Sequence, residues 1–278
     1  MSVRIVTDST CDLPAEVIDR YGILVAPLYI NVGDKGYLDG VDMSREQFYN
    51  QLPSFPVHPT TAVPSPSKFH ALYDSLADEG ANEVLSIHIS ISLSAVSDVA
   101  RLAAKETASI PVTVFDSEQL SLGTGFQVET AAQMAAAGCS IAEIIPVLKD
   151  QIQRSHVFAA LDTLEFLKRS GRMNKYIAGL GTLLQLKPIL TMYAGQPGTE
   201  RVRTRERATK RLLEMLESFS PLERAAIVHT NAPTRLSGLR SQADPFLPKD
   251  NIPTEDITPV IGTHIGPGAV GFAVISEK

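Results

Sequence analysis

Short runs rich in β-branched residues alternate along this chain with segments of helical periodicity, and this alternation limits the possible folds more than any other feature. In the first half, four runs are predicted strands: 3–7, 25–30, 83–89 and 111–117. Helix start signals stand among them, since Ser44 with Gln47 fits a capping box and Ser65 precedes Pro66; a further box follows at Ser140 with Glu143. Strands that alternate with helices predict an α/β fold.

A second series of strands and helices begins near residue 156. Its predicted elements are strands at 156–161, 188–194 and 225–230, a glycine-interrupted helical stretch at 176–186, and an amphipathic helix at 205–219. No low-complexity linker separates the two halves. We therefore expect two α/β domains, residues 1–155 and 156–278, which pack directly and leave a cleft that favours small ligands.

Composition limits the possible cellular compartments and classes of partner. Hydrophobic residues make up 44% and charged residues 20% of the chain, a balance typical of globular proteins, and no apolar run approaches the ~20 residues needed for a transmembrane segment. Cys11 and Cys139 are too few for a disulfide framework, and no signal peptide is visible, so we expect a cytoplasmic protein. The net charge of −6 argues against nucleic acid as a partner.

Positive charge is concentrated in one part of the sequence. Residues 156–211 carry eleven Lys or Arg against four Asp or Glu, although the chain as a whole is acidic. This basic excess is either a solvated face or a docking surface for an acidic partner or a phosphorylated ligand.

Several strong catalytic motifs are missing from the sequence. There is no GxxxxGK[ST] phosphate-binding loop, no GxSxG nucleophile elbow and no HExxH zinc motif. The six histidines are scattered, and none has metal-ligand spacing with another His or Cys. We therefore expect neither a metal nor a cofactor.

Four segments rich in hydroxyl groups or glycine are the candidates for a binding site: 7–10, 59–66, 90–95 and 262–269. The first contains Asp8 and Ser9 and follows the opening strand, at the end where parallel sheets usually bind ligands. The same residues also suit the N-cap of the next helix. In the second segment, three prolines stiffen the backbone around the neighbouring hydroxyl groups.

The other two segments add serines and a histidine. Ser90, Ser92 and Ser94 alternate, so they share one face if the strand before them continues. The glycines of 262–268 allow the backbone to approach a ligand closely, and His264 lies among them. The four segments offer hydrogen-bond donors with few formal charges, which suits a carboxylate better than a multiply charged phosphate.

In this order, the four segments resemble the DegV family of bacterial fatty-acid-binding proteins, and the likeness covers essentially the whole chain. Further matching stretches are Phe115-Asp116-Ser117 with Gly123, the run 161–172, Lys187-Pro188-Ile189-Leu190 and 263–268. The resemblance implies two α/β domains with one long-chain fatty acid, such as palmitate, in a tunnel between them. It also implies a carrier without catalytic activity, which presents the fatty acid to a separate kinase subunit that makes an acyl phosphate with ATP.

The resemblance extends to individual residues. Thr61 and Ser94 look like the family's two hydroxyls that hydrogen-bond the carboxylate, and His264 matches a histidine near the same headgroup. Arg172 matches an arginine that is linked to interaction with the kinase subunit. The residue types themselves add three more predicted ligand-binding residues: Ser92, Asp8 and Ser9.

The chain departs from the family pattern in two places. Ala62-Val63 stands where relatives tend to have Ser-Gln, and Ala95-Val96 stands where Gly-Thr is usual. Ala95 removes backbone freedom at the helix start, and Val96 removes a hydroxyl, so headgroup geometry or coupling to the kinase is open to change. Ligand binding is expected to persist because Thr61 and Ser94 remain.

Two other functions stay open. A hydrolase or acyltransferase would use Ser94 as nucleophile, His264 as base, and Asp8 or Asp116 as the orienting carboxylate. It predicts turnover of an ester. A regulatory protein would bind an acidic macromolecule through the basic stretch 168–211, and it predicts association that weakens strongly with salt.

Overall fold

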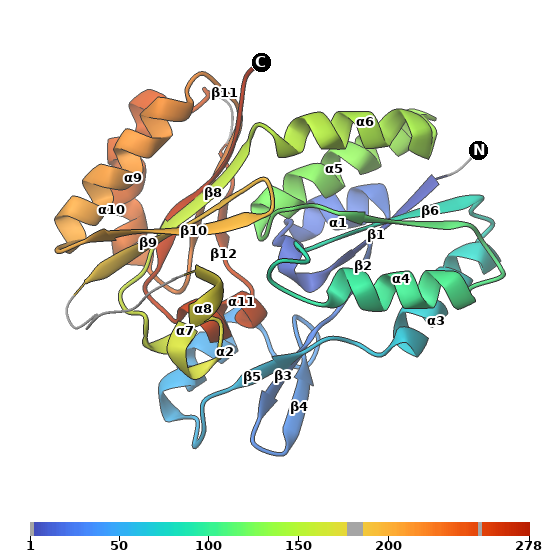
Figure 1. Ribbon diagram of the computed structural model, residues 1–278, viewed down its shortest axis with the longest axis horizontal. Coiled ribbons are helices and arrows are strands. Elements are labelled where there is room, and N and C mark those ends of the chain that lie inside the picture. Colours follow the sequence, from blue (N-terminus) through green and yellow to red (C-terminus); the bar gives the residue numbers. More distant parts are fainter. Residues whose placement is uncertain (1–2, 177–185, 250–251) are drawn as a thin grey trace.

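Three sheets organise the computed structural model, which describes residues 3–176, 186–249 and 252–278 (Figure 1). The first sheet is parallel, in the order β2 (Leu24–Ala26), β1 (Val3–Asp8), β6 (Glu83–His88) and β7 (Val112–Asp116). One face carries α1 (Ala15–Tyr21) and α5 (Leu122–Ala136), with α6 (Ile141–Ile152) beside α5, and the other carries α3 (Pro66–Asp78) and α4 (Val96–Glu106). The chain passes from β1 to β2 on one side of β1 and later returns to add β6 on the other side. The carboxyl end of β1 is therefore a switch point, where α/β sheets usually bind ligands.

The helix start signals in the first half are confirmed with one exception. Capping boxes begin α2 (Arg45–Gln51) at Ser44 and α6 at Ser140. Pro66 occupies the first position of α3, but Ser65 makes no side-chain capping bond to the helix. Its hydroxyl lies 2.8 Å from the hydroxyl of Ser67 instead.

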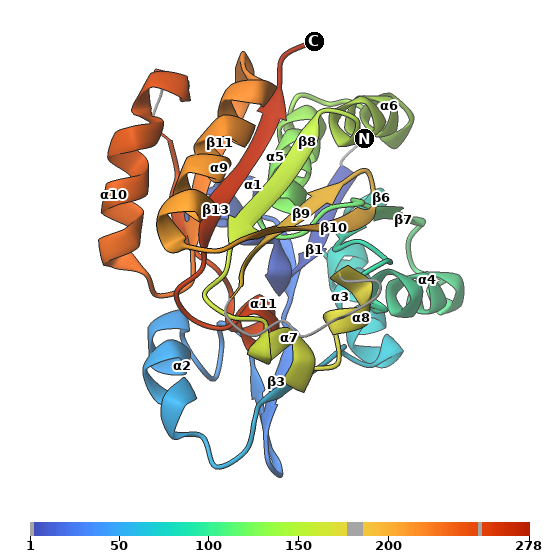
Figure 2. The same ribbon diagram turned by 60° about the vertical axis from the view of Figure 1, so that its left-hand side comes forward.

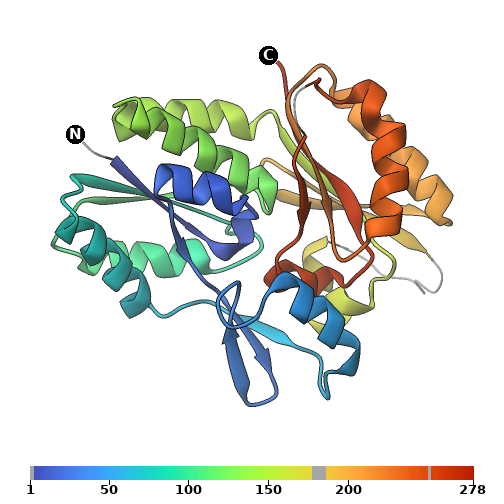
Figure 3. The same cartoon turned by 180° about the vertical axis from the view of Figure 1, so that it is seen from behind.

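The run 25–30 is divided between two sheets, so the prediction of a single strand there is wrong. After β2, the strand β3 (Tyr29–Val32) pairs with β4 (Lys35–Leu38) and β5 (Thr60–Ala62) in a small antiparallel sheet. Pro27 has no N–H for a strand ladder, and the N–H of Leu28 donates to the hydroxyl of Ser9 at 3.2 Å, so the chain changes direction there. Figure 3 shows α2 and this small sheet close to α11 (Pro259–Ile265); the short helix η2 (Leu52–Ser54) follows α2.

The third sheet has six strands in the order β10-β9-β8-β13-β11-β12, antiparallel except for the pair β11–β12. Their bounds are β8 Ser155–Ala160, β9 Lys187–Tyr193, β10 Gln196–Val202, β11 Leu222–His229, β12 Thr254–Asp256 and β13 Val270–Ser276. Helices α9 (Arg205–Phe219) and α10 (Pro233–Ala243), followed by η3 (Asp244–Phe246), cover the outer face (Figure 2). The strands and the amphipathic helix predicted for this half are confirmed. The helical stretch predicted at 176–186, which contains Gly179 and Gly181, lies almost entirely outside the described residues.

One hydrophobic core joins the two large sheets. Side chains alternate along β8: Val157 and Ala159 belong to the core shared with the parallel sheet, whereas Phe158 and Ala160 pack in a second cluster under α9 and α10. The predicted α/β class is therefore confirmed. The division into domains at residues 155 and 156 stays a prediction.

Candidate ligand-binding site

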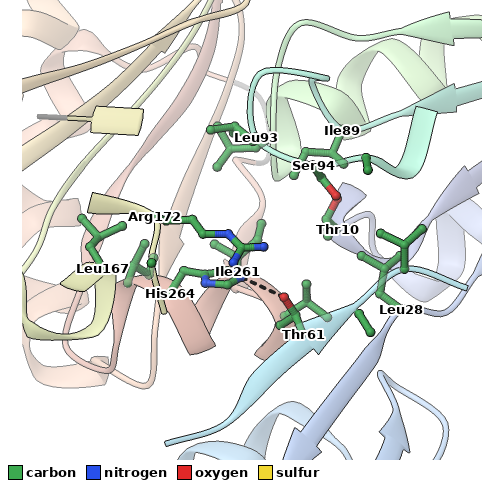
Figure 4. A pocket seen from close by; sticks show the side chains of 17 residues that line it. Thr10, Leu28, Thr61, Ile89, Leu93, Ser94, Leu167, Arg172, Ile261 and His264 are labelled. Carbon is green, nitrogen blue, oxygen red and sulfur yellow. Dashed lines mark hydrogen bonds between the residues drawn. The ribbon is translucent and has the colours of Figure 1, made fainter. Parts of the chain in front are cut away.

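A cavity of about 390 Å³ lies where the three sheets meet. Its walls come from the chain just beyond β1 and β6, from β5, from the loop before α5, from α11, and from the segment around α7 (Glu165–Arg169) (Figure 4). Most of the lining is apolar and includes Leu28, Val63, Ile89, Leu93, Leu120 and Ile261. Its volume lies within the ~300–1,000 Å³ that is usual for ligand pockets.

Thr61 and His264 meet in this cavity although 203 residues separate them. Thr61 lies on β5, an edge strand held in register by its pairing with Ile30 of β3. His264 stands in the last turn of α11, and its Nε2 lies 3.0 Å from the hydroxyl oxygen of Thr61. The small sheet and a helix from the C-terminal end of the chain thus supply one polar group each to the same wall.

Ser94 enters the cavity from the loop between β6 and α4. The strand ends at His88, and the N–H groups of Leu93 and Ser94 both donate to the carbonyl of Ser90, at 3.0 and 3.1 Å. Because the segment is a turn, the prediction that its three serines share a strand face is wrong. Ser92 lies outside the lining, with its hydroxyl 2.9 Å from that of Ser90.

Asp8 and Ser9 also lie outside the lining, and both support residues within it. The carboxylate of Asp8 is fully buried and accepts from the N–H groups of Thr10 and Ile89, at 3.0 and 3.1 Å, with Nδ1 of His88 at 3.0 Å. Burial alone would raise the pKa of Asp8, but the hydrogen bond and charge of His88, together with the hydrogen bonds from Thr10 and Ile89, outweigh it, and the pKa lies below its ordinary value. Asp8 caps the short helix η1 (Ser9–Cys11), whereas α1, the helix that the sequence predicted next, begins after Pro14 without a side-chain cap, so the expected capping of that helix is wrong.

Thr10 is a lining residue that the sequence did not single out, although it belongs to the segment 7–10. Its hydroxyl donates to Oδ1 of Asp8. The signal that could have found it is its place just beyond the carboxyl end of β1, at the switch point.

Arg172 lies in the cavity wall together with the predicted carboxylate-binding residues. The chain turns after α7 at Gly171, whose φ of +72° favours glycine, and the N–H of Arg172 donates to the carbonyl of Leu167 at 3.0 Å. The helix α8 (Met173–Tyr176) follows directly. Figure 4 shows the guanidinium of Arg172 pointing into the cavity beside His264.

A second, mainly apolar cavity adjoins this one towards the interior and is named the apolar continuation. It has a volume of about 40 Å³ and shares Leu120, Ile261 and Ile265 with the first. Its other walls are formed mainly by the inner face of the six-stranded sheet, including Val157, Ala159, Leu190, Met192 and Val228. Its residues are largely buried, whereas Ala62, Ala95 and Gly171 at the polar cavity are exposed, so the polar end lies nearer the surface.

A buried carboxylate holds the two helices that border this space. Asp12 accepts from the N–H of Thr258 at 2.8 Å, at the start of α11, and from the hydroxyl of Ser121 at 2.6 Å, at the start of α5. Arg45 lies 3.3 Å from the same carboxylate. Burial raises the pKa of Asp12 to about 6, against the opposing effects of Arg45 and these hydrogen bonds.

The glycines of 262–268 pack against protein side chains. A Cβ at Gly262 would collide with the ring of Tyr49, and one at Gly266 with the ring of Phe166. These close approaches let α2 and α7 pack against α11. Gly262 and Gly266 therefore have a packing role, and the approach of this backbone to a ligand stays a prediction.

The arrangement expected of a hydrolase is not assembled by these residues. The Nε2 of His264 contacts Thr61 rather than Ser94, and Asp8 contacts His88. Oδ1 of Asp116 accepts from the N–H groups of Glu118 and Ile91, at 3.0 and 3.3 Å. Within the described ranges, no group of three His, Cys, Asp or Glu side chains is placed to hold a metal ion, and no helix is both long and apolar enough to span a membrane.

Comparison with known proteins identifies the family. The model of the DegV family, described as uncharacterised proteins, matches residues 2–277. The chain belongs to the DegV family. A DegV domain-containing protein of Streptomyces coelicolor is 34% identical over 281 residues, which cover 99% of both chains.

Solved DegV structures share the whole fold of the chain. A DegV family protein from Thermus thermophilus, described by its fatty acid binding, has a TM-score of 0.91 and 34% identity, with complete coverage of both chains. DegV from Bacillus subtilis, described as a fatty acid binding protein, also has a TM-score of 0.91, with 30% identity and complete coverage. The resemblance to this family and the α/β fold that it implied are both confirmed.

Proposed function

We propose that this DegV protein is a carrier that binds one long-chain fatty acid in the cavity between its sheets. The observation that carries the proposal is the division of the cavity into a polar end, with Thr61, Ser94 and His264, and an apolar continuation against the six-stranded sheet. A fatty acid has the same division between carboxylate and chain. The fatty acid binding described for the relatives from Thermus thermophilus and Bacillus subtilis supports this choice of ligand.

The acyl chain supplies most of the affinity in this account. A palmitate-sized chain has roughly fourteen methylenes, and each contributes ~0.8 kcal/mol when it leaves water, a gross gain of about 11 kcal/mol before ordering costs. A hydrogen bond from Ser94 or Thr61 adds about 1–3 kcal/mol at most. The hydroxyls therefore orient the headgroup, and the apolar walls retain the ligand.

We also propose that the bound fatty acid is presented to a separate kinase, as the family resemblance implies. The carboxylate oxygen would attack the γ-phosphorus of ATP on the partner, and ADP would leave, which gives an acyl phosphate. Two observations support this role: the sequence has no phosphate-binding loop, and the polar end of the cavity lies nearer the surface than the apolar end.

Calorimetric titration of delipidated protein with saturated fatty acids of increasing length tests the carrier function. We expect one site per chain, and an affinity that rises with chain length until the apolar space is filled, with ~0.8 kcal/mol as the upper limit for each methylene. A fatty-acid methyl ester series provides the control for non-specific apolar binding. No saturable binding at any chain length would contradict the proposal.

A further inference from the structure

A third cavity, of about 240 Å³, lies beside the start of α11 and shares no lining residue with the ligand cavity. Two buried carboxylates line it: Asp12 follows η1, and Asp39 lies in the loop between β4 and α2. Thr258, the residue before α11, also belongs to the lining. Because the exposed Val41 completes part of the wall, this cavity reaches the surface.

Both carboxylates hold Thr258, each through a different atom. The N–H of Thr258 donates to Oδ1 of Asp12 at 2.8 Å, and its hydroxyl donates to Oδ2 of Asp39. The N–H of Asp39 donates to the carbonyl of Leu28 at 2.9 Å, and Leu28 lines the ligand cavity. We call Asp12, Asp39 and Thr258 the α11 latch, because they join the N-terminal part of the chain to the helix that carries His264 into the ligand cavity.

The backbone at the latch has an uncommon conformation. Asp12 has a φ of +54°, and Ser121, whose hydroxyl donates to Asp12 at 2.6 Å, has a φ of +50°. Residues other than glycine seldom adopt this left-handed conformation, and they keep it where surrounding contacts hold it, often at switch regions. Ser121 lines the apolar continuation of the ligand cavity. The contacts of Asp12 therefore hold a conformation that would relax if they weakened.

Negative charge exceeds positive charge around the latch. The titratable or charged groups that face its carboxylates are Arg45 and Tyr49 of α2, Asp8 and Cys11 around η1, and Glu255 and Asp256 of β12. Burial raises the pKa of Tyr49 well above its ordinary value and that of Cys11 to about 12, so both stay neutral. Among the described residues, Arg45 is the one cation that forms an ion pair with a latch carboxylate; it lies 3.3 Å from Asp12 and 3.6 Å from Glu255.

This imbalance favours a proton on the latch while it is closed. Burial raises the pKa of Asp12 to about 6 and that of Asp39 above its ordinary value, and the two carboxylates repel each other when both are ionised. If Thr258 separates from them, water reaches both carboxyls, and their pKa values return towards the ordinary range. The closed form therefore binds the proton more tightly than the open form. It is favoured at low pH and loses this advantage as pH rises through about 6.

We infer that Asp12 and Asp39 form a proton-sensitive latch on Thr258, which regulates the exchange of fatty acid by fixing or releasing α11. Asp39 is accordingly a positioning residue, which acts on the ligand through Thr258 and His264. The inference rests on the proposed function. Because the closed form holds both the proton and the wall that contacts the ligand, protonation of the latch and binding of fatty acid favour each other.

The test measures how fast the protein releases a fatty acid at different pH values. Delipidated wild type and Asp39→Asn are loaded with radiolabelled palmitate, and its transfer to excess serum albumin is followed from about pH 5 to about pH 7.5. In the wild type, the release rate constant should rise about tenfold over this range. Asp39→Asn is neutral at every pH and keeps an oxygen for the hydroxyl of Thr258. Its release should therefore stay at the slow, low-pH rate and change by about twofold or less.

Three further variants separate the latch from other effects. Asp42→Asn is the matched control, because Asp42 is an exposed carboxylate in the same loop, where it accepts from the N–H of Leu38 at 2.8 Å; it should keep the wild-type pH profile. Thr258→Val removes the hydroxyl contact and should release palmitate fast at every pH. Thr258→Ser keeps the hydroxyl and should restore the wild-type profile. Titration of palmitate itself affects all variants alike, so a difference between profiles belongs to the latch.

The outcomes distinguish the latch from the carrier function. A wild-type release rate that does not change with pH would overturn the inference, and so would equal pH profiles of wild type and Asp39→Asn. Faster release from Asp39→Asn at every pH would also overturn it, because it would show a purely structural contact. In each of these cases palmitate still binds and the proposed function stands. A wild type that cannot be loaded with palmitate would overturn the proposed function itself.

Discussion

The apolar continuation of the cavity predicts how one substitution changes chain-length preference. Ala159 lies on β8 and lines the small cavity at the inner face of the six-stranded sheet. Ala159→Leu adds three carbon atoms to a space of about 40 Å³, and these would displace about three methylenes of a long ligand. At ~0.8 kcal/mol each, the loss is about 2.4 kcal/mol, or about 60-fold in affinity for a palmitate-sized chain. Fatty acids shorter by three or four carbons should keep their wild-type affinity.

Ala160 provides the matched control for this experiment. It is the next residue on β8, is also buried, and faces α9 and α10 instead of the cavity. Ala160→Leu should cost about 1–3 kcal/mol of unfolding free energy through overpacking, without a change in chain-length preference. Calorimetric titration of both variants with a fatty-acid series measures the preference, and thermal unfolding without ligand measures the cost. An unchanged preference in a folded Ala159→Leu variant would refute the proposed position of the acyl chain.

Three further predictions concern single polar groups. Ser94→Ala should weaken fatty-acid binding by about tenfold in calorimetry and still retain lipid, because the apolar walls provide most of the affinity. Complete loss of lipid from a folded variant would contradict the view that the walls retain the ligand and the hydroxyls orient it. Asp8→Asn should destabilise the fold by about 3 kcal/mol in chemical unfolding, because it weakens a buried pair. Because the folded-state pKa of Asp8 is depressed, its contribution is present above the unfolded-state pKa and is lost as pH falls through the folded-state value; Asp8→Asn should flatten this acid loss. The pKa of Asp12 is raised to about 6, so its contribution is fully present below the unfolded-state pKa and is lost as pH rises through about 6. Unfolding free energies of wild type and Asp12→Asn between pH 4 and 7 should differ in slope, and parallel curves would contradict this assignment.

Local signals in the sequence predict most of the secondary structure. Capping boxes at Ser44 and Ser140 mark two helices correctly, because their signal depends on residues only three positions apart. The run 25–30 misleads because its apolar residues suit a strand, whereas Pro27 and the bond from Leu28 to Ser9 divide it between two sheets. The alternating serines mislead in the same way, since the turn at Ser90 depends on where β6 ends.

The site could be predicted only in part. Only the family resemblance predicted that Thr61 and His264 lie in one site. No local sequence pattern shows that residues of β5 and α11 meet. Thr10 could have been found from its place just beyond the carboxyl end of β1. The apolar continuation depends on packing between sheets, which neither spacing nor composition reveals. The orientation of Arg172 into the cavity likewise depends on the turn at Gly171, so the sequence showed its charge but not its direction.

Mass spectrometry of the purified protein, native and then denatured, tests the central claim most directly. The account predicts that the native protein carries one fatty acid per chain and that denaturation releases it, which also reveals the preferred chain length. A ligand-free native mass, together with no uptake of added fatty acid, would contradict the carrier function.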